Sequence, residues 1–322
     1  MPPRSPLPAR HGLGAAWVRT PDHDHGRPRP WSTMGHWLRD TSPEGVDVDG
    51  MLERGRFVDD HGRSWNGDEP YRPHTFVHFH RELREEPEVP FELTVLHEDE
   101  RIVVVDKPHF LASIPRGRHV TQSVVVKARA MLDEPTLVPV HRLDRLTAGV
   151  LLLTREPRWR AAYQGIFEAR QVSKTYEAVA AYDPSLELPR RVESHIRKQH
   201  GLAQAFEVPG APVNAITDIE LGQVRGDVAT YRLTPATGRT HQLRLHLNGL
   251  GIPIVGDPLY PEVLDVSVDD FSTPLQLVAS TLEIVDPVDG RIAVHHRVEL
   301  GFGLDDRRRR TGGLAAEGQQ GA

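Results

Sequence analysis

The sequence predicts an α+β domain, built from a mixed, largely antiparallel sheet with flanking helices and preceded by a small N-terminal region. Apolar and β-branched runs of strand length outnumber the segments that have helical spacing. Several of these runs are joined by short turn signals, such as Arg225-Gly226-Asp227, which is typical of hairpins. Strands that follow one another in this way favour an α+β class over regularly alternating strands and helices.

The predicted elements can be placed in order along the chain. The predicted strands are apolar runs at 102–105, 150–153, 175–181, 215–221, 228–233, 275–284 and 291–300. Helices are predicted at 121–132, 158–167 and 240–250. The last of these has Leu243, Leu247 and Leu250 at helical spacing.

Composition restricts the classes of protein that the chain can belong to. The 322 residues are enough to bury a sizeable core, and the lack of cysteine excludes disulfides, thiolate metal sites and cysteine nucleophiles. No apolar run approaches the roughly 20 residues that span a bilayer, and the N-terminus lacks the apolar segment of a secretory signal. We therefore expect a cytoplasmic protein that does not enter a membrane.

The net charge of −6 does not by itself favour nucleic acid as a partner. Local charge matters more than the total, however. Between residues 141 and 200, Lys and Arg exceed Asp and Glu by about four, which is compatible with a surface that faces RNA.

One segment joins a polar run to an apolar run: residues 141–150, HRLDRLTAGV, continue into three leucines. The pattern predicts a loop that presents Asp144 at the end of a buried strand, which supplies rigidity while the loop supplies access. The flanking Arg142 and Arg145 favour the ionised carboxylate, so Asp144 is a candidate nucleophile or base. The alternative is a structural salt bridge where the strand begins.

This segment resembles the H-R-L-D-x-x-T-S-G-L motif of the RluA-type pseudouridine synthases, which isomerise uridine in RNA. Three more segments match that family in the expected order. Residues 97–108 are similar to its acidic turn, strand and Lys-Pro, and residues 167–178 to its F-x-x-R-x-V-x-K-x-Y-x-A. Residues 237–246 are similar to its G-R-T-H-Q-I-R-V-H, and the match continues to residue 260. Together the matches span about residues 93–300. The resemblance implies the pseudouridine synthase fold, RNA as partner, and no cofactor. No metal is expected either, because no carboxylate spacing near the clustered histidines His74, His78 and His80 repeats a recognised metal motif.

The chain departs from the family at two places. Ala148 stands where the family usually has Ser, a small-for-small change that should preserve the turn. After Lys107-Pro108 the family usually has a small residue and then Gly, whereas this chain has His109-Phe110. We therefore expect this loop to differ from the family in shape and in its RNA contacts.

The resemblance also implies roles for three catalytic residues. Asp144 would add covalently to the substrate or stabilise a developing cation on the sugar. Tyr176 would stack on the uracil and assist proton removal through its hydroxyl, and Arg244 would pair with the Asp144 carboxylate. The alternatives are an ordinary core tyrosine on a strand and a surface arginine on an amphipathic helix.

Four basic residues are candidates for RNA binding. A uridine in folded RNA must leave its stack to reach Asp144, and the resemblance implies that Arg142 fills the vacated space or holds the flipped nucleotide. Arg145, Lys174 and Arg239 are candidate phosphate contacts, which would make binding depend on salt. For Arg142, a surface contact with phosphate is the alternative.

The resemblance assigns residues 91–304 to the catalytic domain. Residues 31–90 form an accessory segment, interpreted either as a degenerate small RNA-binding domain or as an extension packed on the catalytic domain. Residues 1–30 and 305–322 are predicted to be disordered, since they contain little to bury.

The leading functional hypothesis is a monomeric RNA pseudouridine synthase that acts on specific uridines in structured ribosomal or transfer RNA. The alternative is a non-catalytic RNA-binding or RNA-folding protein on the same scaffold, against which the intact Asp144, Tyr176 and Arg244 argue. A nucleoside hydrolase using Asp144 would need a water-activating base, and no motif supplies one.

Overall fold

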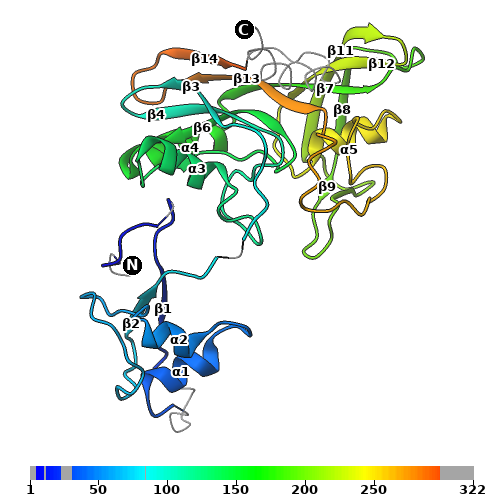
Figure 1. Ribbon diagram of the computed structural model, residues 1–322. Helices are drawn as coiled ribbons and strands as arrows, with labels where there is room; N and C mark the ends of the chain where they lie inside the picture. The colour runs from blue at the N-terminus through cyan, green and yellow to red at the C-terminus, as the bar shows by residue number, and fades with distance from the viewer. Residues whose placement is uncertain (1–4, 11, 23–30, 84, 298–322) are drawn as a thin grey trace, which may run out of the picture. The chain divides into compact units, whose positions relative to one another are not determined.

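The computed structural model describes residues 5–10, 12–22, 31–83 and 85–297, which form two compact units (Figure 1). The smaller unit contains the chain up to Glu86 together with Val126–Pro135, and the larger contains Pro87–Val125 and the chain from Thr136 onward. The prediction had kept all of 91–304 in one domain. Residues 126–135 fall in the smaller unit, where Arg129 donates a hydrogen bond to the Gly12 carbonyl oxygen (3.0 Å).

The smaller unit pairs two antiparallel strands, β1 (Ala16–Arg19) and β2 (Phe76–Phe79), and carries helices α1 (Met34–Thr41) and α2 (Val48–Glu53). Its buried core comprises Met34, Trp37, Leu38, Val48, Met51, Leu52, Phe57, Trp65, Tyr71 and Val77. In α1 the apolar residues recur three and four apart, which places them on one buried face.

Strand β1 corrects the prediction that residues 1–30 are disordered. The prediction weighed composition, and it missed that Val18 packs against this core while β2 supplies hydrogen-bond partners to the strand. Residues 1–4, 11 and 23–30 lie outside the described residues, as does the predicted disordered tail at 305–322.

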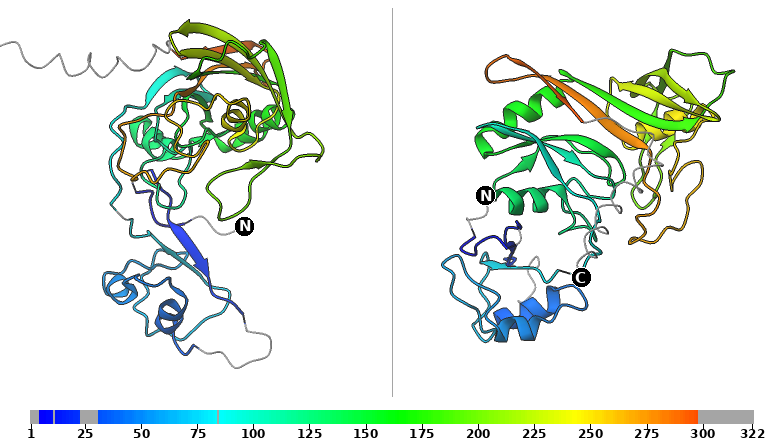
Figure 2. Two further views of the ribbon diagram at one scale, coloured as in Figure 1. Left: turned by 90° about the vertical axis from the view of Figure 1, so that its right-hand side faces the viewer. Right: turned by 45° about the horizontal axis from the view of Figure 1, so that its top comes forward.

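The larger unit is built on a 10-stranded sheet, which runs from β3 at one edge to β8 at the other. Figure 2 shows the strands and helices of this unit from two further sides. Along its main path the strands are β3 (Thr94–Glu98), β4 (Ile102–Lys107), β6 (Ala148–Thr154), β13 (Leu277–Val285), β7 (Val172–Ala181), β12 (Val228–Pro235), β11 (Ala215–Arg225) and β8 (Arg190–Ser194). β5 (Val138–Pro139) pairs with β6, and β14 (Ile292–His296) pairs with β13. Within the described part of the chain, β13 and β6 are parallel and the other pairs are antiparallel. The predicted mixed, largely antiparallel α+β sheet is confirmed.

The remaining elements are α3 (Val124–Leu132), α4 (Pro157–Glu168), α5 (Gln242–Gly249), and the short pair β9 (Ile196–Arg197) and β10 (Phe206–Glu207). Each predicted helix and strand overlaps an observed one. The sequence missed β3 and β8, because β8 is polar and both lie at sheet edges with much of their surface exposed. Edge strands of this kind lack the apolar run that reveals a buried strand.

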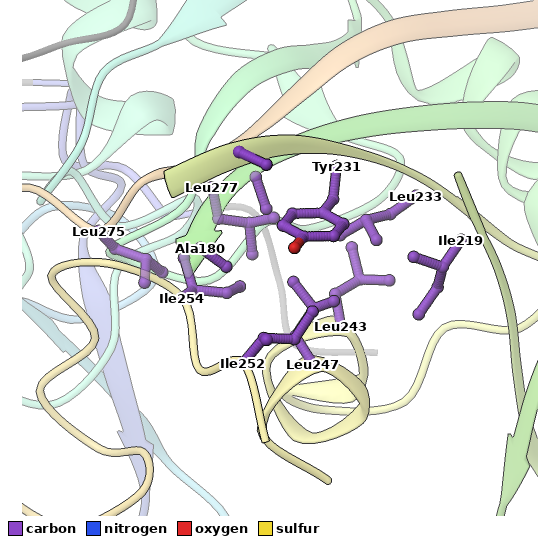
Figure 3. Packing of buried hydrophobic residues seen from close by; sticks show 12 residues of the cluster. Ala180, Ile219, Tyr231, Leu233, Leu243, Leu247, Ile252, Ile254, Leu275 and Leu277 are labelled. Atoms are coloured by element: carbon purple, nitrogen blue, oxygen red, sulfur yellow. The ribbon is translucent and has the colours of Figure 1, made fainter. Parts of the chain in front are cut away.

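Helix α5 is held against the sheet by a buried apolar cluster (Figure 3). Leu243 and Leu247 of α5 point toward Tyr231 and Leu233 of β12, and Ile252 after the helix completes this side of the cluster. This packing fixes the orientation of the helix that carries Arg244. A second cluster packs Tyr163 and Ile166 of α4 against the β4 and β6 side chains Ile102, Val104, Val150 and Leu152.

Replacing Tyr163 by Phe should lower the free energy of unfolding by about 1–3 kcal/mol. The Tyr163 hydroxyl donates to Asp286 Oδ2 (2.6 Å) and accepts from Arg101 Nε (3.3 Å), so the change leaves a nearly buried carboxylate without one donor. Urea unfolding measures the difference. Tyr182→Phe, whose hydroxyl has no partner among the described residues, is the control and should change stability by less; equal losses would contradict the argument.

Candidate active site

Most of the predicted site residues line one cavity of about 640 Å³ in the larger unit. It is lined by the loop before β6, the end of α4, strand β7 and the segment leading into α5. All of the predicted site residues except Arg145 meet here: Arg142, Asp144, Lys174, Tyr176, Arg239 and Arg244. Arg145 instead lines a second cavity, of about 740 Å³, which shares Asp144, His241 and Arg244 with the first.

The loop that carries Asp144 is fixed by buried hydrogen bonds. Lys107, fully buried on β4, donates from Nζ to the carbonyl oxygens of Pro108 (3.0 Å), Leu111 (2.7 Å) and Arg145 (3.1 Å). Ser113 Oγ both donates to the Leu143 carbonyl (2.7 Å) and accepts from its N–H (3.0 Å). The backbone on both sides of Asp144 is therefore held in place.

Gly149 allows β6 to continue directly from this loop. Its φ is +118°, and a Cβ built there would lie 2.2 Å from the Ala279 carbonyl oxygen of the neighbouring β13. A side chain at this position would push β13 away from β6. The close approach of the two strands thus requires glycine.

The Asp144 carboxylate lies partly exposed at this site. Among the described residues it makes no side-chain hydrogen bond or ion pair, although its main-chain oxygen accepts from the Thr147 N–H (3.1 Å). Within the described residues, Asp144 therefore does not form the structural salt bridge that was the alternative. The carboxylate is available to a bound substrate.

Arg244 does not pair with Asp144, contrary to the prediction. Its guanidinium donates from Nε to Asp257 Oδ2 (2.7 Å) and from Nη2 to Asp257 Oδ1 (2.5 Å), and both side chains are almost fully buried. Asp257 also accepts from the Leu259 N–H (2.8 Å), and the guanidinium lies over the Tyr260 ring. Since Arg244 lines both cavities with Asp144, it supplies positive charge near that carboxylate without being its hydrogen-bond partner.

Tyr176 lies on β7 and faces the first cavity. Burial, together with the negative charge of Asp144, raises the pKa of its hydroxyl. Tyr176 therefore remains a neutral phenol at physiological pH, able to donate a hydrogen bond and to offer its ring face to a base.

Positive charge gathers around the first cavity. Arg142 and Arg239 are exposed, while burial lowers the pKa of Lys174. The cavity adds Arg170, an exposed residue directly after α4 with a φ of +57°. Arg170 belongs to a segment that resembles the family, but its sequence position gave no sign that it would join Arg142 at the same opening.

His241 was not predicted as a site residue, yet it lines both cavities. Its Nδ1 lies 3.0 Å from the Tyr260 hydroxyl, which accepts from the Ala205 N–H (2.8 Å) and lies 3.0 Å from the Ala205 carbonyl oxygen. If the hydroxyl proton goes to that carbonyl, His241 donates from Nδ1 and keeps a lone pair on Nε2. Burial lowers the pKa of His241 to about 4, so the ring is neutral.

Buried histidines should make the larger unit sensitive to acid. Burial lowers the pKa of His141 to about 3 and the pKa values of His109, His241 and His246 to about 4, from 6.5. Below pH 6.5 the unfolded chain binds these protons and the folded chain does not, so stability is lost as pH falls from 6.5 toward 4. Each such histidine contributes a slope of about 1.4 kcal/mol per pH unit.

Urea unfolding between pH 7.5 and 4.5 measures that slope. His141 Nε2 accepts from the Leu152 N–H (3.2 Å), and protonation would break this bond. His141→Gln keeps an acceptor without titrating, so it should remove one histidine's share of the slope. A free energy of unfolding that stays constant down to pH 4.5 would contradict the prediction.

The chain is similar to known proteins over most of this unit. Residues 101–249 match a family described as RNA pseudouridylate synthase. The dual-specificity RNA pseudouridine synthase RluA of Salmonella typhi is 33% identical over 212 residues, which cover 63% of this chain and 91% of that protein. The chain belongs to the RluA-type RNA pseudouridine synthase family. It is therefore an isomerase of the class that acts on RNA, as predicted.

One further relative agrees with this assignment, and one solved structure shares the fold. An uncharacterized RNA pseudouridine synthase of Synechocystis is 35% identical over 182 residues, which span 54% of this synthase and 60% of the relative. The human RNA pseudouridylate synthase domain containing 1 has a TM-score of 0.50 at 23% identity, covering 67% of this chain and 86% of that one, and it shares the fold. No helix among the described residues of the synthase is long and apolar enough to cross a bilayer.

Proposed function

We propose that this synthase converts specific uridines of structured ribosomal or transfer RNA to pseudouridine, with Asp144 as its catalytic carboxylate. The observation that carries the proposal is an Asp144 carboxylate without a side-chain partner in the described part of the chain, in a cavity rimmed by cations and faced by a neutral Tyr176. Arg142, Lys174 and Arg239 contact RNA phosphates or the flipped nucleotide, and binding weakens as salt rises. Arg145 contributes from the adjoining cavity.

The reaction breaks the bond between C1′ and N1 of the target uridine, turns the ring, and forms a bond between C1′ and C5. One proton leaves C5 and one is gained at N1, so the RNA keeps its mass. Asp144 adds to the nucleotide or stabilises the cation that develops on the sugar. Tyr176 stacks on the uracil and its hydroxyl assists removal of the C5 proton. Arg244, held by Asp257, places a positive charge at the cavity that Asp144 also lines.

The smaller unit acts in this proposal as a degenerate RNA-binding domain that helps to select the RNA. Its sheet carries Trp17, 47% exposed, whose ring packs edge-on against Phe76 (5.4 Å between centroids), with the Arg19 guanidinium over the same Phe76 ring. Exposed aromatic rings beside a cation are suited to stacking with unpaired bases. The synthase works as a monomer in the cytoplasm, where these RNAs are found.

A transcriptome-wide map of pseudouridine in cells lacking the gene tests the proposal. The cells are rescued with the wild-type protein, Asp144→Asn or Trp17→Ala. Loss of a discrete set of sites in ribosomal or transfer RNA, restored by wild type and not by Asp144→Asn, is expected, with fewer sites restored by Trp17→Ala. If all sites persist without the gene, the proposed substrates are wrong; if Asp144→Asn restores them as well as wild type does, Asp144 is not the catalytic carboxylate.

A further inference from the structure

The second cavity, of about 740 Å³, adjoins the proposed catalytic carboxylate, and the proposed reaction places no part of the target uridine in it. Asp144, His241 and Arg244 line both cavities, so the two meet at these residues. Lys174 and Tyr176 line only the first cavity. The second has largely apolar walls, from Phe110, Ile254, Val255, Pro258, Leu264 and Val266.

Phe110 gives this cavity a feature that the family resemblance did not predict. It stands where the family usually has Gly, and it keeps a left-handed backbone with a φ of +65° although its aromatic ring is buried. A bulky residue in this conformation is a true outlier, which persists only when its surroundings compensate for the strain. This chain thus has a residue with a strained backbone, in place of glycine, at a cavity that Asp144 also lines.

The surroundings of Phe110 hold its ring as one wall of the cavity. The ring packs edge-on against Phe271 (5.3 Å between centroids) and lies parallel to Phe91 (6.1 Å). The Arg145 guanidinium lies 5.7 Å from the ring centre, and its Nη1 donates to the Phe110 carbonyl oxygen (3.4 Å). Arg145 is therefore fixed at this wall as a cation that can face an incoming nucleotide.

We propose that this second cavity binds the unstacked base of a nucleotide adjoining the target uridine, and that Phe110 determines which base it accepts. The inference rests on the proposed function, since it assumes that the target enters the first cavity, beside Tyr176. When the target leaves its stack, its neighbour loses a stacking partner and is free to turn. A base has apolar faces and polar edges, which match apolar walls with Arg145 at one side, and the cavity lies within the usual size range of ligand sites.

The test measures kcat/KM for pseudouridine formation on a short RNA that carries a uridine modified by the wild-type synthase. In two further RNAs, the nucleotide before or after that uridine is replaced by an abasic ribose. For the wild type, one of these replacements should lower kcat/KM at least about tenfold, since stacking of one base contributes that much. Phe110→Gly should lose a similar factor on the intact RNA and nothing more on the abasic one.

Two exposed valines provide a test substitution and a matched control, and neither change should disturb the buried core. Val266→Ala removes part of the cavity wall at a residue that is 44% exposed, whereas Val285→Ala makes the same change at a 51% exposed position on β13, outside both cavities. We expect Val266→Ala to lower kcat/KM on the intact RNA and to be neutral on the abasic RNA. Val285→Ala should be neutral on both.

The outcomes distinguish failure of the proposed function from failure of the proposed base-binding cavity. If the wild type forms no pseudouridine in any RNA, the proposed function fails. If it turns over the intact RNA and neither abasic replacement matters, the cavity does not bind a neighbouring base and this inference is overturned. The same holds if losses from Phe110→Gly and from the abasic site multiply, since the residue and the base would then act independently.

Discussion

Replacing Asp144 by Asn should lower the rate of pseudouridine formation by at least about a thousandfold, because an amide can neither add to the substrate nor carry the negative charge that stabilises a cation. RNA binding should change little, since the cations around the cavity remain in place. Single-turnover kinetics measures the chemical step, and filter binding measures the affinity.

Asp218→Asn is the control for this change, because Asp218 lies exposed on β11, outside both cavities. It should leave the rate within about twofold of the wild type. An Asp144→Asn variant with a substantial residual rate would show that another group carries the chemistry, and the catalytic assignment would then be abandoned.

Replacing Asp257 by Asn should lower the free energy of unfolding by about 3–5 kcal/mol, because it leaves the Arg244 guanidinium buried without a counter-charge. The two side chains are 1% and 2% exposed, so water cannot replace the lost carboxylate. Urea unfolding measures the loss. Asp218→Asn again serves as control, since it removes an exposed partner of Arg191 and should cost under about 1 kcal/mol.

The double variant Arg244→Met, Asp257→Leu separates the stabilising role of the pair from its role in the reaction. Removing both charges should recover much of the stability lost by Asp257→Asn, as apolar replacements of buried ion pairs often do. Activity should stay low, because Asp144 then lacks the positive charge of Arg244. Recovery of both stability and activity would make the pair purely structural.

The sequence predicted the centre of the site because its signals are local. Asp144 sits where a polar run meets the buried strand β6, and that contrast is visible in neighbouring residues. The partner of Arg244 was not predictable in this way. Asp257 lies after the end of α5, and only the turn of the chain after Ile254 brings it to the guanidinium. Pairing across a turn depends on packing, which single-residue patterns do not contain.

In the fold, too, elements encoded by neighbouring residues were predicted, whereas elements that depend on distant contacts were missed. Buried runs such as β4 and β6 were found, and so was the β11–β12 hairpin with its Gly226 turn. β1 was missed because two features outside its own four residues stabilise it, namely pairing with β2 and the core around Val18. Phe110 illustrates the limit most clearly, since its departure from the family pattern was visible while its left-handed backbone and its contact with Arg145 were not.

The hydrogen bonds from Lys107 to three backbone carbonyl groups limit how far the protein can change its conformation when RNA binds. A loop whose backbone is clamped on both sides of Asp144 has little freedom left to adapt. Under the proposed function, the RNA must therefore change its conformation to bring the target uridine to the Asp144 carboxylate. An RNA is a better substrate when the free-energy cost of deforming it is low. A uridine in a loop or beside a mismatch therefore has an advantage over the same uridine in a regular helix. The deformability of the RNA around a uridine then contributes to substrate selection, in addition to its base sequence.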